Sequence, residues 1–135
     1  SDEVICSLID KSYEIINEAD SWLVTANPKY YDVITAFKES NEIIWKQSSD
    51  IHVGDLVYLY VGEPYSKVMY KCVAIDVNIP YDYKDNNLTI NKVMKIKLLE
   101  ELGDRDYTFS YLNKIGIKAI RGPRKISEII VKLLK

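Results

Sequence analysis

The chain has 135 residues, of which 47% are hydrophobic and 28% are charged, and its formal net charge is -2. This length is that of a single domain, and the hydrophobic fraction is sufficient for a core that needs no metal ion or disulfide. The longest apolar runs are only a few residues, such as 129–131, so the sequence excludes a membrane-spanning helix, and the small net charge argues against a protein that coats nucleic acid indiscriminately.

The elements predicted along the chain combine helices with strands. Apolar residues recur at helical spacing over 3–19, and we assign this amphipathic helix to an N-terminal helical extension, residues 1–20. The other predictions are, in order, a strand at 21–25, a helix at 31–38, strands at 43–47, 56–61 and 68–77, a long turn-rich excursion at 78–91, a strand at 92–99, a short helix at 111–115, an irregular segment at 116–123 and an amphipathic helix at 125–135.

The strand predicted over 56–61 is the strongest of these signals. Its residues are apolar throughout, which suits a strand that is buried on both faces, as in a small closed barrel. Several such strands with helices around them predict an α+β fold over residues 21–135, a small mixed β-barrel flanked by helices.

The positions of the charged residues and cysteines indicate which partners the protein binds and in which cellular compartment we expect it. Residues 112–135 hold seven basic residues and one acid, so this segment carries +6 and the rest of the chain -8. A basic end on an acidic body allows a local contact with phosphates, although a solvated helix face gives the same pattern. Cys6 and Cys72 lie far apart in apolar surroundings, and the N-terminal residues lack the pattern of a signal peptide, so we expect reduced core cysteines and a cytoplasmic protein.

Catalytic chemistry is sparsely represented. His52 is the one histidine of the chain, which excludes a His-rich zinc site and an HNH-type nuclease centre, and no glycine-rich loop for nucleotide phosphates is present. Three pairs of carboxylates could hold a divalent cation or act as acid and base, but they fall in predicted polar turns, which favours solvated loops. These pairs are Asp82 and Asp85, Glu100 and Glu101, and Asp104 and Asp106. We therefore expect no catalytic residue, no metal ion and no cofactor.

Aromatic residues are abundant, with eleven tyrosines and two tryptophans. Those near predicted loops are Trp22, Trp45, Tyr65, Tyr81 and Tyr83. Aromatic side chains at loop mouths stack on bases or enclose cations, and core packing is the alternative, which is favoured for Trp22 at the start of a strand.

The motifs around these aromatics resemble those of EVE domains, which belong with YTH domains to the PUA-like superfamily. The segment WLVTANP at 22–28 resembles the first strand of that family. The segment IWKQ at 44–47, followed by VGDLVYLYV at 53–61, is similar to the family's tryptophan and its Gly-Asp-x-Val-Tyr-x-Tyr strand. The pattern continues with GEPY at 62–65, YKCVA at 70–74 and GIKAIRGPRKI at 116–126, so the resemblance covers residues 21–134.

The resemblance implies a function. YTH domains bind N6-methyladenine in RNA, and several EVE-type domains bind modified cytosine or adenine in DNA, often fused to nucleases or GTPase motors of modification-dependent restriction systems. It therefore implies a non-catalytic module that binds modified double-stranded DNA by flipping one base into an aromatic pocket, with a fused or associated nuclease or NTPase as partner and no membrane. An RNA-binding accessory domain is the alternative. An enzyme or small-molecule binder that uses the carboxylates is a third interpretation.

The same resemblance suggests the site residues. Trp45 would form one wall of the pocket, and Tyr65, Tyr81 or Tyr83 the facing wall, because the chain lacks the third tryptophan of YTH cages. The remaining pocket residues would be Trp22, Ala26, Asn27, Lys46, Gln47 and Ser48, and the phosphate contacts Lys118, Arg121, Arg124 and Lys125. Extruding a base costs a few kcal/mol, and stacking on aromatics returns about 1–3 kcal/mol, so two walls and edge hydrogen bonds would offset it.

Overall fold

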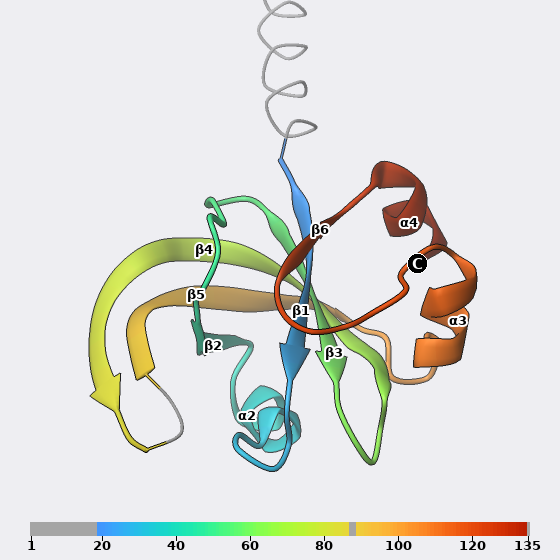
Figure 1. Ribbon diagram of the computed structural model, residues 1–135. Coiled ribbons are helices and arrows are strands. Elements are labelled where there is room, and N and C mark those ends of the chain that lie inside the picture. The colour runs from blue at the N-terminus through green and yellow to red at the C-terminus, as the bar shows by residue number, and fades with distance from the viewer. Residues whose placement is uncertain (1–18, 87–88, 135) are drawn as a thin grey trace, which may run out of the picture.

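The computed structural model describes residues 19–86 and 89–134, which form one mixed sheet and three short helices (Figure 1). The strands are β1 (Ser21–Ala26), β2 (Glu42–Lys46), β3 (Leu56–Val61), β4 (Lys67–Lys84), β5 (Thr89–Glu101) and β6 (Arg124–Ile126). The helices are α2 (Val33–Glu39), α3 (Phe109–Lys114) and α4 (Glu128–Leu133). The helix predicted over 3–19 lies outside the described residues, except for its last position.

The six strands follow the order β2-β5-β4-β3-β1-β6. Neighbours are antiparallel except β1 and β3, which run parallel with Ala26 opposite Val61, so both strands end at the same edge of the sheet. Among the described residues no pairing joins the edge strands β2 and β6, and β6 has only 3 residues. The mixed α+β class is confirmed, whereas the prediction of a closed barrel was wrong because the sheet stays open between these edges.

Two hydrophobic cores lie on opposite faces of the sheet. Val33 and Phe37 of α2 cover one face, and α3 and α4 pack on the other with Leu112 and Ile130 (Figure 1). Strand β3 supplies both cores, because Val57, Leu59 and Val61 face α2 while Tyr58 faces α3 and α4. This double burial explains its continuous apolar sequence and confirms that prediction.

The largest difference from the sequence-based prediction concerns residues 78–91. Instead of a loop, β4 continues to Lys84 and pairs with β5 from Thr89, so the two strands leave the sheet as a curved ribbon (Figure 1). The pairing shifts register on both sides of Ile79 and Pro80, and Asn78 has a φ of 56°. The turn-forming residues thus sit at β-bulges, which bend a ribbon without ending it.

The C-terminal helix α4 is shorter than the helix predicted over 125–135. Residues 124–126 pair with β1 as β6, and Ser127 then caps α4 by accepting a hydrogen bond from Ile130 N at 3.4 Å. The irregular segment at 116–123 and the short helix near 111–115 are confirmed. Cys72 is a buried free thiol whose pKa burial raises to about 12, which confirms one of the two predicted core cysteines, and Cys6 lies outside the described residues.

Candidate nucleic-acid interface

A pocket of about 500 Å³ opens where the parallel strands β1 and β3 end, and we call it the strand-end pocket. Its lining residues are Thr25, Ala26, Asn27, Lys29, Tyr60, Gly62, Glu63, Ile120 and Arg121. The arrows of β1 and β3 point to this edge in Figure 1. The volume is in the range of pockets that enclose small ligands, and a single nucleobase fits such a space.

Backbone hydrogen bonds shape this pocket. Gly62 N donates to Ala26 O at 2.8 Å, which holds the loop after β3 against the end of β1. A Cβ atom at Gly62 would lie 3.6 Å from that same carbonyl oxygen, in ordinary van der Waals contact, so this position also has room for a small side chain. Asn27 Oδ1 accepts from Lys29 N at 3.0 Å and forms an Asx turn, while the Asn27 amide nitrogen has no partner in the described part of the chain. The predicted pocket residues Ala26 and Asn27 therefore both lie in the strand-end pocket, and one amide donor is available there.

Basic side chains continue from this pocket to a neighbouring one. A second pocket, of about 490 Å³, is lined by Ala119, Arg121, Gly122, Pro123, Arg124 and Lys125, and we call it the arginine pocket. Arg121 lines both pockets, Lys29 adds a second cation to the first, and Glu63 is its one acid. Within the described residues neither Arg121 nor Arg124 has an acidic partner, so both guanidinium groups are available to an anion.

The other two predicted phosphate contacts have partners inside the fold. Lys118 Nζ donates to Asn113 O at 3.2 Å, near the end of α3. Lys125 Nζ lies 3.2 Å from Asp20 Oδ2 and 5.5 Å from the centre of the Trp22 ring. Both lysines are exposed, and Lys125 lines the arginine pocket, whereas Lys118 lines neither pocket.

Trp45 is half-buried on the edge strand β2, opposite Met94 of β5. The ring that faces it is Tyr31, with centroids 5.1 Å apart and an interplanar angle of 84°. Neither the strand-end pocket nor the arginine pocket includes Trp45. An edge-to-face contact of this kind fills the space beside the indole with another ring rather than leaving a slot between parallel walls.

Tyr31 was not among the site residues predicted from the sequence. The pair of adjacent tyrosines between β1 and α2 is the sequence feature that could have identified it. The backbone N–H groups of Tyr30 and Tyr31 both donate to Asn27 O, at 3.0 and 3.1 Å. The loop of residues 27–32 therefore lines the strand-end pocket at one end and contacts Trp45 at the other. Burial, together with the negative charge of Asp32, raises the pKa of the Tyr31 hydroxyl.

The structure places several predicted pocket residues elsewhere. Trp22 is only 6% exposed and its indole N–H donates to Asp55 Oδ2 at 2.9 Å, so it is a core residue. The buried Gln47 amide is also hydrogen-bonded inside the fold, because Nε2 donates to Asn78 Oδ1 at 3.1 Å and Oε1 accepts from Asn78 N at 2.8 Å. A side chain with both ends bonded inside the fold is not available to read a base edge.

The remaining predicted residues are exposed but dispersed. Lys46 and Ser48 flank the buried Gln47 on the surface. Tyr81 and Tyr83 lie on the outer ribbon of β4, where Tyr83 Oη donates to Asp85 at 2.8 Å. Tyr65 follows Pro64 in the loop after β3 and is exposed, and it lines neither the strand-end pocket nor the arginine pocket.

Catalytic and metal-binding groups are not assembled in the described residues. They contain no group of three or more His, Cys, Asp or Glu side chains that could hold a metal ion. His52 is 3.7 Å from Asp50 in an exposed turn, and Arg105 is paired with both Glu100 and Asp104, at 2.9 and 2.7 Å. Within the same residues, no helix is long and apolar enough to cross a membrane.

Of the comparisons with known proteins, the one with solved structures bears on the fold. No protein-family model matches the sequence, and no curated protein matches it. Similar solved structures include a hypothetical protein from Leishmania major, with 15% identity and a TM-score of 0.63 over 88% of this chain and 96% of that one. A protein from Agrobacterium tumefaciens has 12% identity and a TM-score of 0.64 over 86% of this chain and 90% of that one.

A third similar structure is the ASCH protein from Zymomonas mobilis, with 9% identity and a TM-score of 0.61 over 85% of this chain and 93% of that one. ASCH proteins have a PUA-like fold, so this similarity supports the PUA-like type that the sequence predicts. Identities this low bear on the fold alone.

Proposed function

We propose that this chain is a non-catalytic nucleic-acid-binding domain of the EVE type, which recognises a modified base flipped out of double-stranded DNA. The observation that carries the proposal is the arrangement of the strand-end pocket, large enough for one base, beside the arginine pocket, with Arg121 lining both. A nucleotide that leaves a duplex brings its base and its flanking phosphates together, and the two neighbouring pockets match these two parts.

The phosphates would contact the basic side of this arrangement. Arg121 and Arg124 have no acidic partner among the described residues, and a planar guanidinium matches two phosphate oxygens at once. Lys125, already oriented by Asp20 and Trp22, would extend the contact by one phosphate. Contacts of this kind position the nucleic acid and carry no sequence information.

The base would be read inside the strand-end pocket. The free Asn27 amide nitrogen supplies a donor, the Glu63 carboxylate an acceptor and the Tyr60 ring an aromatic surface. In this arrangement Trp45 acts through Tyr31, because their contact holds the loop of residues 27–32 in place. This assigns Trp45 an anchoring role instead of the wall that the resemblance implies.

Binding measurements with matched nucleic acids test the proposal. Duplexes of one sequence carrying adenine, N6-methyladenine, cytosine, 5-methylcytosine or 5-hydroxymethylcytosine, and the same strands as RNA, are titrated at a fixed salt concentration. At least one modified duplex is expected to bind tighter than its unmodified form by about tenfold or more, since discrimination at one base edge is worth about 1–3 kcal/mol. Equal binding of all duplexes contradicts the proposal, and a preference for RNA over every duplex replaces it by an RNA-binding accessory domain.

Asn27→Ala provides the residue-level test. It is expected to remove most of the discrimination between modified and unmodified duplex, because the pocket loses its free donor. Asn91→Ala, an exposed asparagine on β5 and far from this pocket in the sheet order, is the matched control and is expected to bind as the unchanged chain does. The proposal further assigns DNA cleavage or translocation to a separate nuclease or NTPase module, so this chain alone should leave modified DNA intact.

A further inference from the structure

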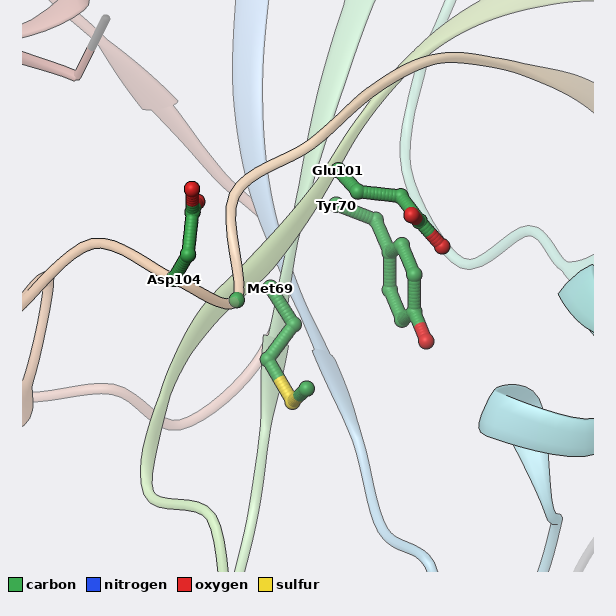
Figure 2. Close-up of a pocket in the computed structure, with 5 residues that line it drawn as sticks. Met69, Tyr70, Glu101 and Asp104 are labelled. Carbon is green, nitrogen blue, oxygen red and sulfur yellow. The ribbon is translucent and has the colours of Figure 1, made fainter.

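A third pocket, of about 390 Å³, lies at the end of β5, and we call it the β5 pocket (Figure 2). Its lining residues are Met69, Tyr70, Glu101, Gly103 and Asp104. Tyr70 of β4 pairs with Glu101 of β5 in the sheet, and Figure 2 shows the Glu101 carboxylate beside the Tyr70 ring, with the Met69 side chain next to them. Asp104 points away from this pair in the same view.

The β5 pocket and the strand-end pocket share no lining residue. Met69 and Tyr70 belong to the core that α2 covers. Tyr60 and Ile120, which line the strand-end pocket, pack instead against the core under α3 and α4. A ligand in the β5 pocket would therefore not compete directly with a nucleotide in the other one.

Tyr70, which lines the β5 pocket, carries a hydroxyl group at the end of its ring that points away from Asp104 (Figure 2). The residue is only 4% exposed, and Phe37 packs on it with centroids 4.7 Å apart. Its hydroxyl makes no hydrogen bond to any described residue. Burial, followed by the negative charge of Glu101, raises the pKa of Tyr70 to about 12, so the phenol is neutral at pH 7 and its oxygen can accept a hydrogen bond.

The charge around the β5 pocket is negative, and one carboxylate is unpaired. Two cations lie near it: Arg105 pairs with Glu100 and Asp104, and the Lys67 ammonium donates to Gly103 O and keeps its positive charge. The Glu101 carboxylate has no ion pair with any described residue. Segment 100–106 contains four acids and one arginine, so its net charge is -3.

We propose that the β5 pocket binds a guanidinium or alkylammonium group. Such a group only donates hydrogen bonds, and the pocket offers two acceptors, the Glu101 carboxylate and the Tyr70 hydroxyl oxygen. Its aliphatic stem would lie on the Met69 side chain, and the negative surroundings would repel an anion. The group has two chemical sources, the basic side chain of a protein partner and a free polyamine, and the chemistry of recognition is the same for both.

The chain contains two methionines, which makes the pocket directly observable. Met69 lines the pocket, whereas Met94 is fully buried in the core and serves as the internal reference. With [13C]methyl-methionine in the full chain, titration with butylguanidine is expected to shift the Met69 signal in a saturable way and to leave Met94 unmoved. The neutral isostere butylurea should produce little shift, and an equal shift with butylurea overturns the proposal.

Substitutions assign the shift to the proposed acceptors. Glu101→Gln is expected to weaken butylguanidine binding by about tenfold or more, since it removes a charge-assisted hydrogen bond, and Tyr70→Phe by a smaller factor. Glu100→Gln is the matched control, because Glu100 is paired with Arg105, and it should change affinity little. Unchanged affinity in Glu101→Gln, with Met94 unmoved as a sign of intact folding, overturns the proposal.

Two further ligands distinguish the sources. A capped Gly-Arg-Gly peptide that binds tighter than spermidine indicates a protein partner, and the reverse order indicates a polyamine. Failure of all three cationic ligands to move Met69 overturns the proposal. Binding of DNA should be the same in Glu101→Gln as in the unchanged chain, so the outcome is independent of the proposed nucleic-acid function.

Discussion

The two tryptophans occupy contrasting surroundings. Trp22, in the first strand, is buried and donates its indole N–H to Asp55, and the Lys125 ammonium covers its ring. Trp45, on an edge strand, is half exposed, and the one aromatic ring that it contacts among the described residues is Tyr31, whose loop continues to the strand-end pocket. A tryptophan with a buried carboxylate partner organises the core, whereas one at a sheet edge beside a loop can control the shape of a binding site.

The carboxylate of Asp55 is the centre of the first of these regions. It accepts hydrogen bonds from Trp22 Nε1 at 2.9 Å, His52 N at 3.0 Å and Asp20 N at 3.1 Å. One side chain thereby connects the start of β1, the turn before β3 and β3 itself. Among the described residues, the region around Trp45 has no comparable buried carboxylate. We therefore expect substitutions around Trp22 and around Trp45 to have different effects on stability and binding.

The largest expected effect is on stability, at Asp55. Asp55→Ala leaves three donors without their acceptor, and we expect the free energy of unfolding to fall by about 3 kcal/mol or more. Urea denaturation followed by circular dichroism measures it. Asp50→Ala is the control, because that side chain is 86% exposed, and its effect should stay within about 0.5 kcal/mol. Similar decreases in both variants would remove the distinction between the two tryptophan regions.

Leucine substitutions of the tryptophans should separate stability from binding. Trp22→Leu is expected to lower the free energy of unfolding by about 1–3 kcal/mol, because Asp55 loses a buried hydrogen bond, and to change DNA affinity less than Trp45→Leu does, because Lys125 keeps its ion pair with Asp20. Trp45→Leu is expected to cost less stability and to weaken binding to modified duplex by about three- to tenfold, because the edge-to-face interaction that positions Tyr31 is removed.

Each leucine variant also leaves a single tryptophan, which allows an independent readout. In Trp22→Leu the emission of Trp45 should change when modified DNA is added. In Trp45→Leu the emission of buried Trp22 should stay constant. The opposite pattern would place the bound nucleotide near Trp22 and would contradict the proposed division of roles.

A smaller effect concerns the basic side of the interface. Replacing Arg121 and Arg124 together by Gln should weaken all duplexes alike, and the slope of log K against log salt should decrease in magnitude by about 0.9 for each phosphate that the variant no longer neutralises. Lys132→Gln, an exposed cation of α4 outside both pockets, removes a charge without altering either pocket. A weaker base discrimination without a change in slope would show that the arginines read the base instead.

The smallest effect is the pH dependence of the α2 cap, which lies next to Tyr31. Hydrogen bonds from the Thr35 hydroxyl and backbone N–H, at 2.7 and 3.1 Å, hold the pKa of Asp32 below its usual value of 3.8. The carboxylate therefore contributes stability that is fully present above pH 3.8 and disappears as the pH falls through the lower folded pKa. As the pH falls below 3.8, the difference in the free energy of unfolding between the unchanged chain and Asp32→Ala should therefore shrink. An NMR titration of the Asp32 carboxyl group measures its pKa directly.

Much of the sheet could be predicted because the signal is local. The continuous apolar run of β3 and the Asn27-Pro28 end of β1 indicate strands and their limits without any knowledge of partners. The outer ribbon could not be predicted, since Asn78 and Pro80 are turn formers and only pairing with β5 makes them part of a strand. Ala26, Asn27 and Arg121 meet as the motifs suggest, whereas the contact of Trp45 with Tyr31 depends on how the chain returns after α2.

The buried Gln47 side chain anchors the base of the outer ribbon. Hydrogen bonds between the Gln47 side-chain amide and Asn78 join the end of β2 to the base of the ribbon. None of the described residues from 78 to 92 belongs to either hydrophobic core. Hydrogen exchange in the ribbon should consequently report a local opening that leaves β1 and β3 protected. We therefore expect the ribbon to open as one unit about the Gln47–Asn78 hydrogen bonds while the rest of the sheet stays folded.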